Sequence, residues 1–174
     1  MSSPRVITVF GGSGAVPGSE AYATAEAVGR RIAALGYAVA TGGYGGTMEA
    51  VSRGAAAGGA EVVGVTCRIW STRPNAYLTR LIETDDYYQR LQTLVEVATA
   101  GYVVLPGATG TLVELALVWE LAAKGAFEPP RPIVCVGDHW RPVHAVLAGR
   151  HPSAAAALAF VSGPEELGRY FRGA

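Results

Sequence analysis

Lysine is almost absent from this sequence of 174 residues, in which Lys124 is the only one. Because Gly125 follows it, the Gly-Lys-Ser/Thr element of a P-loop for nucleoside triphosphates does not occur. Cysteine and histidine are scarce as well, and they form no CxxC or HExxH pattern. We therefore expect neither a metal nor another cofactor, and we expect the histidines (His139, His144 and His151) at the surface or its boundary.

An excess of either charge is also lacking, because 14 Lys and Arg residues balance 14 Asp and Glu residues. The chain as a whole therefore has no field that would attract nucleic acid or an anionic membrane surface. No apolar run approaches the roughly 20 residues needed to span a bilayer. We expect neither nucleic acid nor a membrane as a partner.

Apolar residues, in contrast, make up 50% of the chain, while charged residues make up 16%. This profile is typical of a compact α/β core, and the length predicts one domain over residues 1–174. Cys67 and Cys135 lie in or just after apolar runs, so we interpret them as reduced thiols of a cytoplasmic protein. Residues 1–4 lead directly into a strand, and we expect no signal peptide.

Short apolar runs alternate with segments of helical periodicity along the whole chain. We expect strands at residues 5–10, 37–40, 61–65, 78–83, 102–105, 133–136 and 158–161. We expect helices at residues 18–35, 48–57, 85–97, 111–124 and 139–147, and a terminal helix that starts at 163–166. This alternation predicts the α/β class: a Rossmann-like, doubly wound parallel sheet with helices on both faces. Such a sheet binds its ligand at the carboxyl ends of the strands, and the irregular segment 66–77 is a candidate lid or subunit contact.

Three glycine-rich turns follow predicted strands, at residues 11–14, 42–47 and 106–111. A turn of this kind before a helix leaves backbone N–H groups free to bind an anion, with the helix dipole behind them. A single turn of this kind is explained by the conformational freedom of glycine alone. Three of them at the ligand-binding edge favour a ligand that carries a phosphate. The predicted phosphate-binding residues are Gly12, Ser13, Gly43, Gly45, Gly46, Thr47, Gly107, Thr109, Gly110 and Thr111.

Two other kinds of site fit the sequence less well. In the dinucleotide fingerprint after the first strand, Pro17 occupies the position of the third glycine. The second strand ends at residues 40–42 without the acid that would bind a ribose hydroxyl. The GxSxG elbow of hydrolases is absent, so Ser13 is a poor candidate nucleophile.

Arg90 and Glu114 are the candidate catalytic side chains. Taken alone, Arg90 fits a solvated position early in a helix, and Glu114 fits a carboxylate that complements the dipole in a first turn. Glu114 nevertheless lies one turn inside the helix that starts at the third glycine-rich turn, beside the predicted anion. Glu120, near the other end of that helix, is expected to have a structural role by pairing with Lys124.

The segments 42–50 and 106–114 and the arginine ahead of the fifth strand resemble the Lonely Guy family. Residues 9–14 also look like the first turn of that family, and the resemblance spans about residues 5–136. Two positions depart from the family pattern: Ala108 replaces a glycine of its PGGxGTxxE motif, and Leu91 replaces the lysine of its MxxRK element. The older "lysine decarboxylase" label of such sequences has no support here, because no lysine is placed to form a Schiff base.

The resemblance implies hydrolysis of the N-glycosidic bond of a nucleoside 5′-monophosphate, which releases the free base and ribose 5-phosphate. It assigns the family's catalytic arginine and glutamate to Arg90 and Glu114. It also implies a dimer, and we expect a homodimer or a higher homo-oligomer. Two alternatives stay open. Relatives on this fold include carriers of phosphorylated cofactors such as the molybdenum cofactor, and a third interpretation is a regulatory nucleotide sensor.

Overall fold

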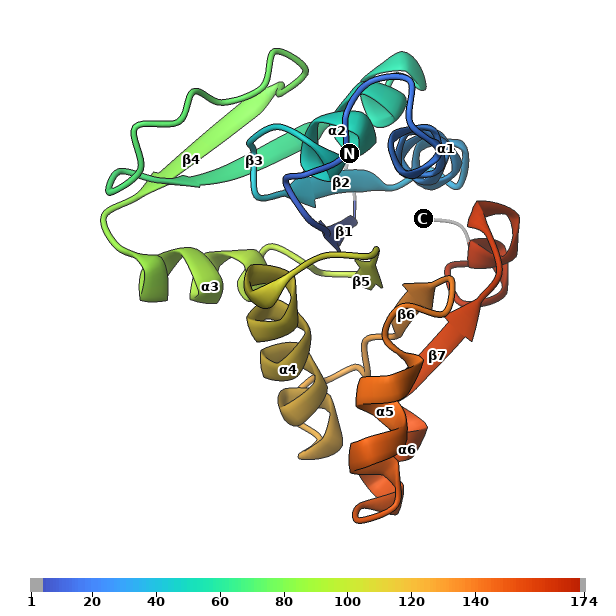
Figure 1. Cartoon of the computed structure of the whole chain (residues 1–174). Coiled ribbons are helices and arrows are strands. Elements are labelled where there is room, and N and C mark those ends of the chain that lie inside the picture. Colours follow the sequence, from blue (N-terminus) through green and yellow to red (C-terminus); the bar gives the residue numbers. More distant parts are fainter. Residues whose placement is uncertain (1–4, 173–174) are drawn as a thin grey trace.

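A parallel sheet runs through the middle of the protein (Figure 1). The computed structural model describes residues 5–172, and residues 1–4, to which the expectation about a signal peptide refers, lie outside that range. Within the described range the sheet has seven strands in the order β4-β3-β2-β1-β5-β6-β7. Every pair of neighbouring strands is parallel, so the predicted Rossmann-like α/β class is confirmed.

The elements follow the predicted alternation closely. The strands are β1 (Val6–Phe10), β2 (Ala38–Thr41), β3 (Val62–Cys67), β4 (Arg80–Thr84), β5 (Gly101–Val104), β6 (Ile133–Val136) and β7 (Leu158–Val161). The helices are α1 (Glu20–Ala34), α2 (Thr47–Ala57), α3 (Tyr87–Glu96), α4 (Thr109–Ala123), α5 (Arg141–Ala148) and α6 (Pro152–Ala157), followed by the 3₁₀ helix η1 (Pro164–Arg169). Helix α6 was not predicted from the sequence, and an ordinary helix was expected where η1 forms.

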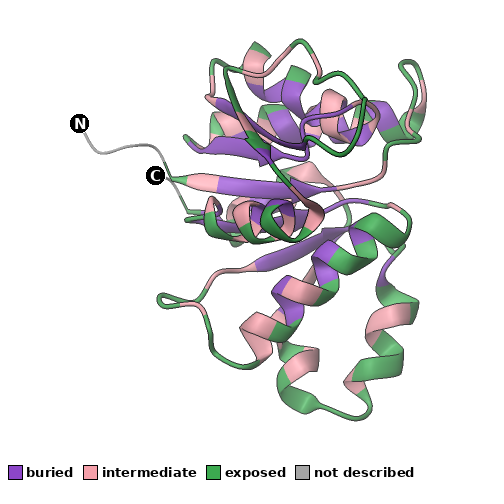
Figure 2. Ribbon diagram, turned by 90° about the vertical axis from the view of Figure 1, so that its left-hand side faces the viewer, coloured by how far each residue is buried: buried purple, intermediate pink, exposed green. Residues whose placement is uncertain are grey.

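Helices cover both faces of the sheet because successive strand residues point in opposite directions. In β1, Ile7 and Val9 pack with α1, α2 and η1, whereas Phe10 packs with α3 and α4 on the other face. Buried residues accordingly concentrate in the strands and on the inner sides of the helices (Figure 2). Cys67 and Cys135 are buried and free, as expected of reduced core thiols.

Helices α1 and α2 approach each other very closely. A Cβ atom at Gly54 of α2 would overlap the Glu26 carbonyl oxygen of α1, and one at Gly29 of α1 would overlap the Val51 carbonyl oxygen of α2. Only glycine leaves room for the facing backbone at these two positions. This close contact fixes α2, and with it the turn at residues 42–46 that opens onto the candidate site.

Strands β2, β3 and β4 follow one another on one side of β1, and β5, β6 and β7 follow one another on its other side. The direction in which strands are added therefore changes between β1 and β5, which are neighbours in the sheet. In open α/β sheets a ligand binds at such a switch point, outside the carboxyl ends of the strands. Two of the three glycine-rich turns follow these two strands. Among residues 5–172, no helix is long and apolar enough to cross a membrane.

Candidate active site

A hollow of about 340 Å³ opens at the carboxyl ends of β1, β2, β3 and β5. It is lined by Gly11, Gly12, Ser13, Tyr44, Met48, Trp70, Thr72, Tyr87, Arg90, Ala108, Gly110, Thr111 and Glu114. Six of the predicted site residues therefore meet here: Gly12, Ser13, Arg90, Gly110, Thr111 and Glu114. Gly43, Gly45, Gly46, Gly107 and Thr109 belong to the surrounding turns, and Thr47 lines a different hollow.

Helix α4 begins at this hollow without a side-chain cap. Its N-cap residue is Ala108, which has no side-chain acceptor, and the Leu112 N–H is bonded to the Ala108 carbonyl at 3.0 Å. The N–H groups of Thr109, Gly110 and Thr111 precede that bond and have no partner within the helix. By contrast, Ser19 caps α1 and Asp86 caps α3 with their side chains. The uncapped start of α4 is therefore a potential anion site.

The replacement of glycine by Ala108 does not disturb this turn. Ala108 has φ −106° and ψ −151°, which is extended backbone that any residue adopts. Gly107 is different, because a Cβ there would overlap the Thr111 side chain and lie 3.0 Å from the Gly12 nitrogen. Glycine is thus required at position 107 but not at position 108, where this chain departs from the family motif.

The turn before α2 has a different role from the one expected. The Thr47 N–H donates to the Gly12 carbonyl at 3.0 Å, so this amide is not free to bind a phosphate. The Thr47 side chain lines a separate hollow of about 290 Å³ with Leu105 and Val136. Gly46 has φ +70° and leaves no room for a Cβ beside the Ser13 backbone. This turn therefore positions the β1 loop, and we correct the expectation that the Thr47 amide faces the anion.

Arg90 and Glu114 come together beside the start of α4. Nη1 of Arg90 lies 3.5 Å from Oε1 of Glu114, and the residues are 5% and 9% exposed. The interpretation of Arg90 as a solvated helix residue is therefore wrong. Its other nitrogens are occupied as well, since Nε donates to the Val65 carbonyl at 2.9 Å and Nη2 donates to the Gly42 carbonyl at 3.2 Å. These bonds fix the guanidinium against the ends of β3 and β2.

Burial raises the pKa of Glu114 from its ordinary 4.5 to about 7, even though the charge of Arg90 and its hydrogen bond act in the opposite direction. The effect of burial is larger than that of Arg90 because the carboxylate is almost completely removed from water. Burial also raises the pKa of Tyr87, with a further contribution from Glu114. A carboxyl group that titrates near neutral pH beside a hollow is suited to proton transfer.

Aromatic side chains that the sequence analysis did not assign to the site complete the wall next to Arg90. The Arg90 guanidinium lies 5.1 Å from the Trp70 ring centre and 5.6 Å from that of Tyr44. Trp70 also contacts the Tyr87 ring at 5.5 Å between centres. The available signal was Trp70 itself, a large aromatic in the polar segment 66–77. Met48 and Thr72 were missed too, although they lie in the segments 42–50 and 66–77 that the sequence had singled out.

His139 supports the α4 turn from the end of β6. Its Nε2 atom lies 2.9 Å from the Gly107 carbonyl oxygen. A carbonyl only accepts hydrogen bonds, so the proton of this bond resides on Nε2. The next residue, Trp140, donates its indole N–H to the Leu105 carbonyl at 3.0 Å. The two side chains hold both ends of the turn that leads into α4.

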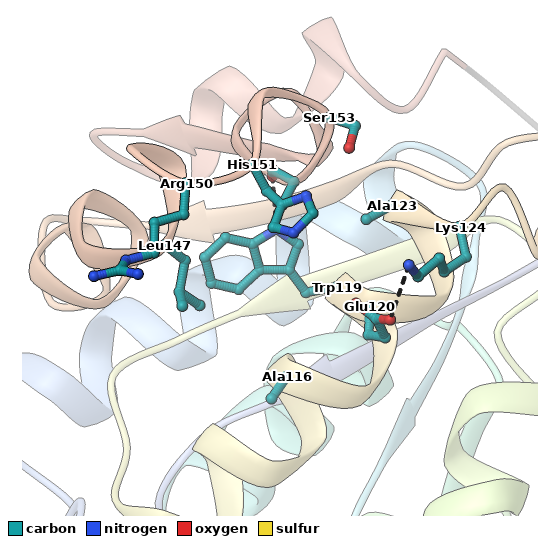
Figure 3. Close-up of a pocket in the computed structure, with 10 residues that line it drawn as sticks. Ala116, Trp119, Glu120, Ala123, Lys124, Leu147, Arg150, His151 and Ser153 are labelled. Carbon is teal, nitrogen blue, oxygen red and sulfur yellow. Dashed lines mark hydrogen bonds and ion pairs between the residues drawn. The ribbon is translucent and has the colours of Figure 1, made fainter.

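A second hollow of about 290 Å³ lies between α4 and the pair α5 and α6 (Figure 3). Three of its side chains have partners: Trp119 donates to the Ala154 carbonyl at 2.6 Å, and Lys124 lies 3.8 Å from Glu120. The predicted pairing of Glu120 with Lys124 is therefore confirmed. Because this hollow has no buried charge pair of the kind found at Arg90 and Glu114, we place the candidate active site at the switch point.

No group of three or more His, Cys, Asp and Glu side chains in residues 5–172 is arranged to hold a metal ion. What the described residues do bring together is an uncapped helix start, a buried carboxyl group and an arginine fixed by backbone carbonyls. The fold and the site define a Rossmann-like protein with an uncapped helix start and a buried carboxyl group at the switch point of its sheet.

The chain belongs to the SLOG cluster4 family, whose model matches residues 4–138. A cytokinin riboside 5′-monophosphate phosphoribohydrolase of Rhodococcoides fascians is 30% identical over 156 residues, which is 84% of this chain and 78% of the relative. One of the same name from Mycobacterium marinum is 38% identical over 119 residues, 67% of this chain and 62% of the relative. These matches confirm the predicted resemblance to the Lonely Guy family.

Among solved structures, the molybdenum cofactor binding protein of Rippkaea orientalis superposes with a TM-score of 0.75 at 24% identity. The match covers 96% of this chain and 94% of that one. At this identity the likeness establishes a common fold.

Proposed function

We propose that this protein hydrolyses the N-glycosidic bond of a nucleoside 5′-monophosphate and releases the free base and ribose 5-phosphate. The relatives in Rhodococcoides fascians and Mycobacterium marinum carry the name of such an enzyme. The observation that carries the proposal is the position of Glu114, a buried carboxyl group with a pKa of about 7, one turn from the uncapped start of α4.

In the proposed complex the 5′-phosphate binds the N–H groups of Thr109, Gly110 and Thr111, with the helix dipole behind them. The Ser13 hydroxyl on the opposite loop is a further donor, because it lines the same hollow. A phosphate fixed there holds the ribose beside Glu114. Positioning of this kind lowers a reaction barrier by several kcal/mol, up to roughly 10 in the most favourable cases.

The bond between C1′ and the base nitrogen breaks, and its electron pair leaves with the base. Positive charge then develops on the ribose ring, as in other glycoside hydrolyses. The Glu114 carboxylate stabilises this charge and accepts a proton from the water whose oxygen bonds to C1′. The base nitrogen takes a proton from solvent. Arg90 orients Glu114 through the contact between Nη1 and Oε1.

The proposal is tested by incubating the protein with AMP and separating adenine and ribose 5-phosphate by chromatography. Glu114→Gln keeps the shape of the side chain and is expected to lower turnover by orders of magnitude with the fold intact. Glu120→Gln is the matched control, because Glu120 lies on the same helix and pairs with Lys124 away from the hollow. An unchanged rate in Glu114→Gln would exclude the assigned role.

A carrier of a phosphorylated nucleotide or cofactor is the second candidate. It is favoured by Leu91, which stands where active family members carry a lysine. The same turn would then bind the phosphate without bond cleavage. AMP that stays bound for hours without release of adenine supports the carrier and contradicts the hydrolase.

We also propose a cytoplasmic homodimer. Helix α4 is apolar on both sides, and Leu112 and Val113 are exposed on it, as Tyr88 is on α3. Such a helix is typical of burial on two sides, so a second copy is the expected partner. A purely monomeric species in sedimentation equilibrium at micromolar concentration would contradict the dimer.

The proposed location in the cytoplasm is supported by the two buried free cysteines, which favour a reducing compartment.

A further inference from the structure

Trp70 is the most accessible of the three tryptophans, with 39% of its surface exposed, whereas Trp119 and Trp140 are 4% exposed. It lies just after β3 and lines the candidate active site. Its ring contacts the Arg90 guanidinium and the rings of Tyr44 and Tyr87, with the Tyr44 ring centre at 5.9 Å. A large aromatic surface therefore remains accessible in the wall of a hollow that also contains the buried charge pair.

The segment that carries Trp70 is fixed to the rest of the site. The Tyr44 hydroxyl donates to the Cys67 carbonyl at 3.2 Å and accepts from the Cys67 N–H at 2.8 Å. Further along, the Asn75 N–H donates to the Gly43 carbonyl at 2.9 Å, and its side-chain amide donates to the Tyr44 carbonyl at 3.0 Å. Trp70 therefore lies between two anchors that fix this segment beside the hollow.

The contacts along the hollow follow the order of the parts of a nucleotide. The free amides of α4 come first, and Glu114 lies one turn further along the helix. Arg90 contacts Glu114, and Trp70 contacts Arg90. A nucleoside monophosphate bound with its phosphate at the amides and its ribose at Glu114 carries its base towards the Trp70 end.

The side chains around the Trp70 end of the hollow offer few groups that could form hydrogen bonds with the edge of a base. Apart from Glu114 and Arg90, which pair with each other, the polar side chains of the hollow are Ser13, Thr72, Thr111 and the hydroxyls of two tyrosines. The Tyr44 hydroxyl is already bonded to Cys67. No Asn, Gln or Asp lines the hollow to form a bidentate pair with a base edge.

We propose that Trp70 binds the nucleobase of the substrate by stacking on its face, so that binding affinity follows the stacking area of the base. This inference rests on the proposed function for the position of the phosphate and the ribose. Aromatic stacking is tolerant of the base because every base has a π face. The larger purine ring covers more of the indole.

Binding of AMP, CMP and ribose 5-phosphate is measured by calorimetry in the wild-type protein, Trp70→Ala, Trp70→Phe and the control Ile69→Ala. Ile69 is the exposed apolar neighbour that does not line the hollow. Trp70→Ala is expected to weaken AMP binding about tenfold or more. Ribose 5-phosphate, which lacks a base, should bind the wild type and the variant alike. Trp70→Phe should restore part of the AMP affinity, and CMP should bind the wild type more weakly than AMP.

Tryptophan fluorescence gives a second readout that does not require catalysis. AMP should quench the emission of the wild type, ribose 5-phosphate should not, and the quenching should disappear in Trp70→Phe, which retains Trp119 and Trp140. Equal loss of AMP and ribose 5-phosphate affinity in Trp70→Ala would mean a structural role and would overturn the stacking proposal. Unchanged AMP affinity in that variant would overturn it too while leaving the phosphate site intact. If the wild type binds neither AMP nor ribose 5-phosphate, the proposed function fails together with this inference.

Discussion

Nη1 of Arg90 lies 3.5 Å from Oε1 of Glu114 in the most buried part of the candidate active site. The arginine cannot turn away, because the carbonyls of Val65 and Gly42 hold its Nε and Nη2 atoms. It therefore orients the carboxyl group from one side and leaves the other side open to the hollow. The carboxyl group meets two opposing influences, burial and the arginine charge, and burial is the stronger one.

The pH dependence of turnover should reflect Glu114. Its pKa is raised by burial to about 7, so the carboxylate that the proposed mechanism needs is lost as the pH falls below that value. We expect kcat/KM for AMP to fall about tenfold per pH unit below pH 7 and to level off above it. Initial rates between pH 5 and 9 measure this, with Glu120→Gln as the control that keeps the same profile. A rate independent of pH across this range would contradict a role for the Glu114 carboxylate.

The stability of the fold should also depend on the protonation of Glu114, but it should be greater at low pH, where turnover is lower. Because the folded-state pKa is above the ordinary 4.5, folding favours the protonated form. The contribution of Glu114 to the free energy of unfolding is therefore greatest below about pH 4.5 and declines as the pH rises to about 7. In Glu114→Gln this decline should disappear. Urea unfolding at pH 5 and pH 8 measures the difference. An equal change in the free energy of unfolding between these pH values in both proteins would contradict the raised pKa of Glu114.

Replacing Arg90 by lysine should separate its charge from its geometry. Lysine keeps the charge but cannot reach both carbonyls and the carboxylate, so at least one buried carbonyl loses its donor. We expect a loss of about 1–3 kcal/mol in the free energy of unfolding. The pKa of Glu114 should rise slightly, because the hydrogen bond from Arg90 that lowers it is lost while the positive charge, which also lowers it, is kept. The measured outcome is a kcat/KM profile displaced slightly to higher pH, and a profile in the wild-type position would show that Arg90 acts on Glu114 through its charge alone.

His139 should affect phosphate binding more than stability. Its hydrogen bond to the Gly107 carbonyl is at the exposed surface and contributes about 1 kcal/mol at most to the fold. Without it the turn before α4 is less well fixed, so His139→Ala should bind ribose 5-phosphate severalfold more weakly with a similar melting temperature. His151→Ala is the control, because that side chain lines the second hollow. Identical affinities in both variants would remove His139 from the site.

The contact of α1 with α2 makes a prediction about stability alone. In Gly54→Ala the new methyl group meets the Glu26 carbonyl, which belongs to a helix backbone and cannot move aside freely. Overpacking costs about 1–3 kcal/mol, while alanine gains about 1 kcal/mol in helix propensity. We expect a net loss of about 1 kcal/mol. Gly149→Ala is the control, because a Cβ there meets no atom within 4 Å; a stable Gly54→Ala would mean that the helices separate without cost.

The strands and most helices were predictable because their signals are local. Buried parallel strands appear as short apolar runs, and helix starts carry Ser19 or Asp86, whose side chains cap α1 and α3. The segment 152–157 was not recognised as a helix, because it has no periodic apolar face to mark it. The terminal segment keeps its predicted Pro164 at the first helical position but forms a 3₁₀ turn.

By itself, the sequence determined the class of fold, the three glycine-rich turns and the identity of Arg90 and Glu114 as candidates, since each depends on residues close together in the chain. Only the tertiary structure decided which amides remain free, because the Thr47 N–H is occupied by Gly12, a residue from another strand's loop. It also decided that Arg90 is buried, that Trp70 lies against it and that His139 reaches Gly107. These relationships join the ends of strands that are distant in the sequence, and their geometry is set by the order of strands in the sheet.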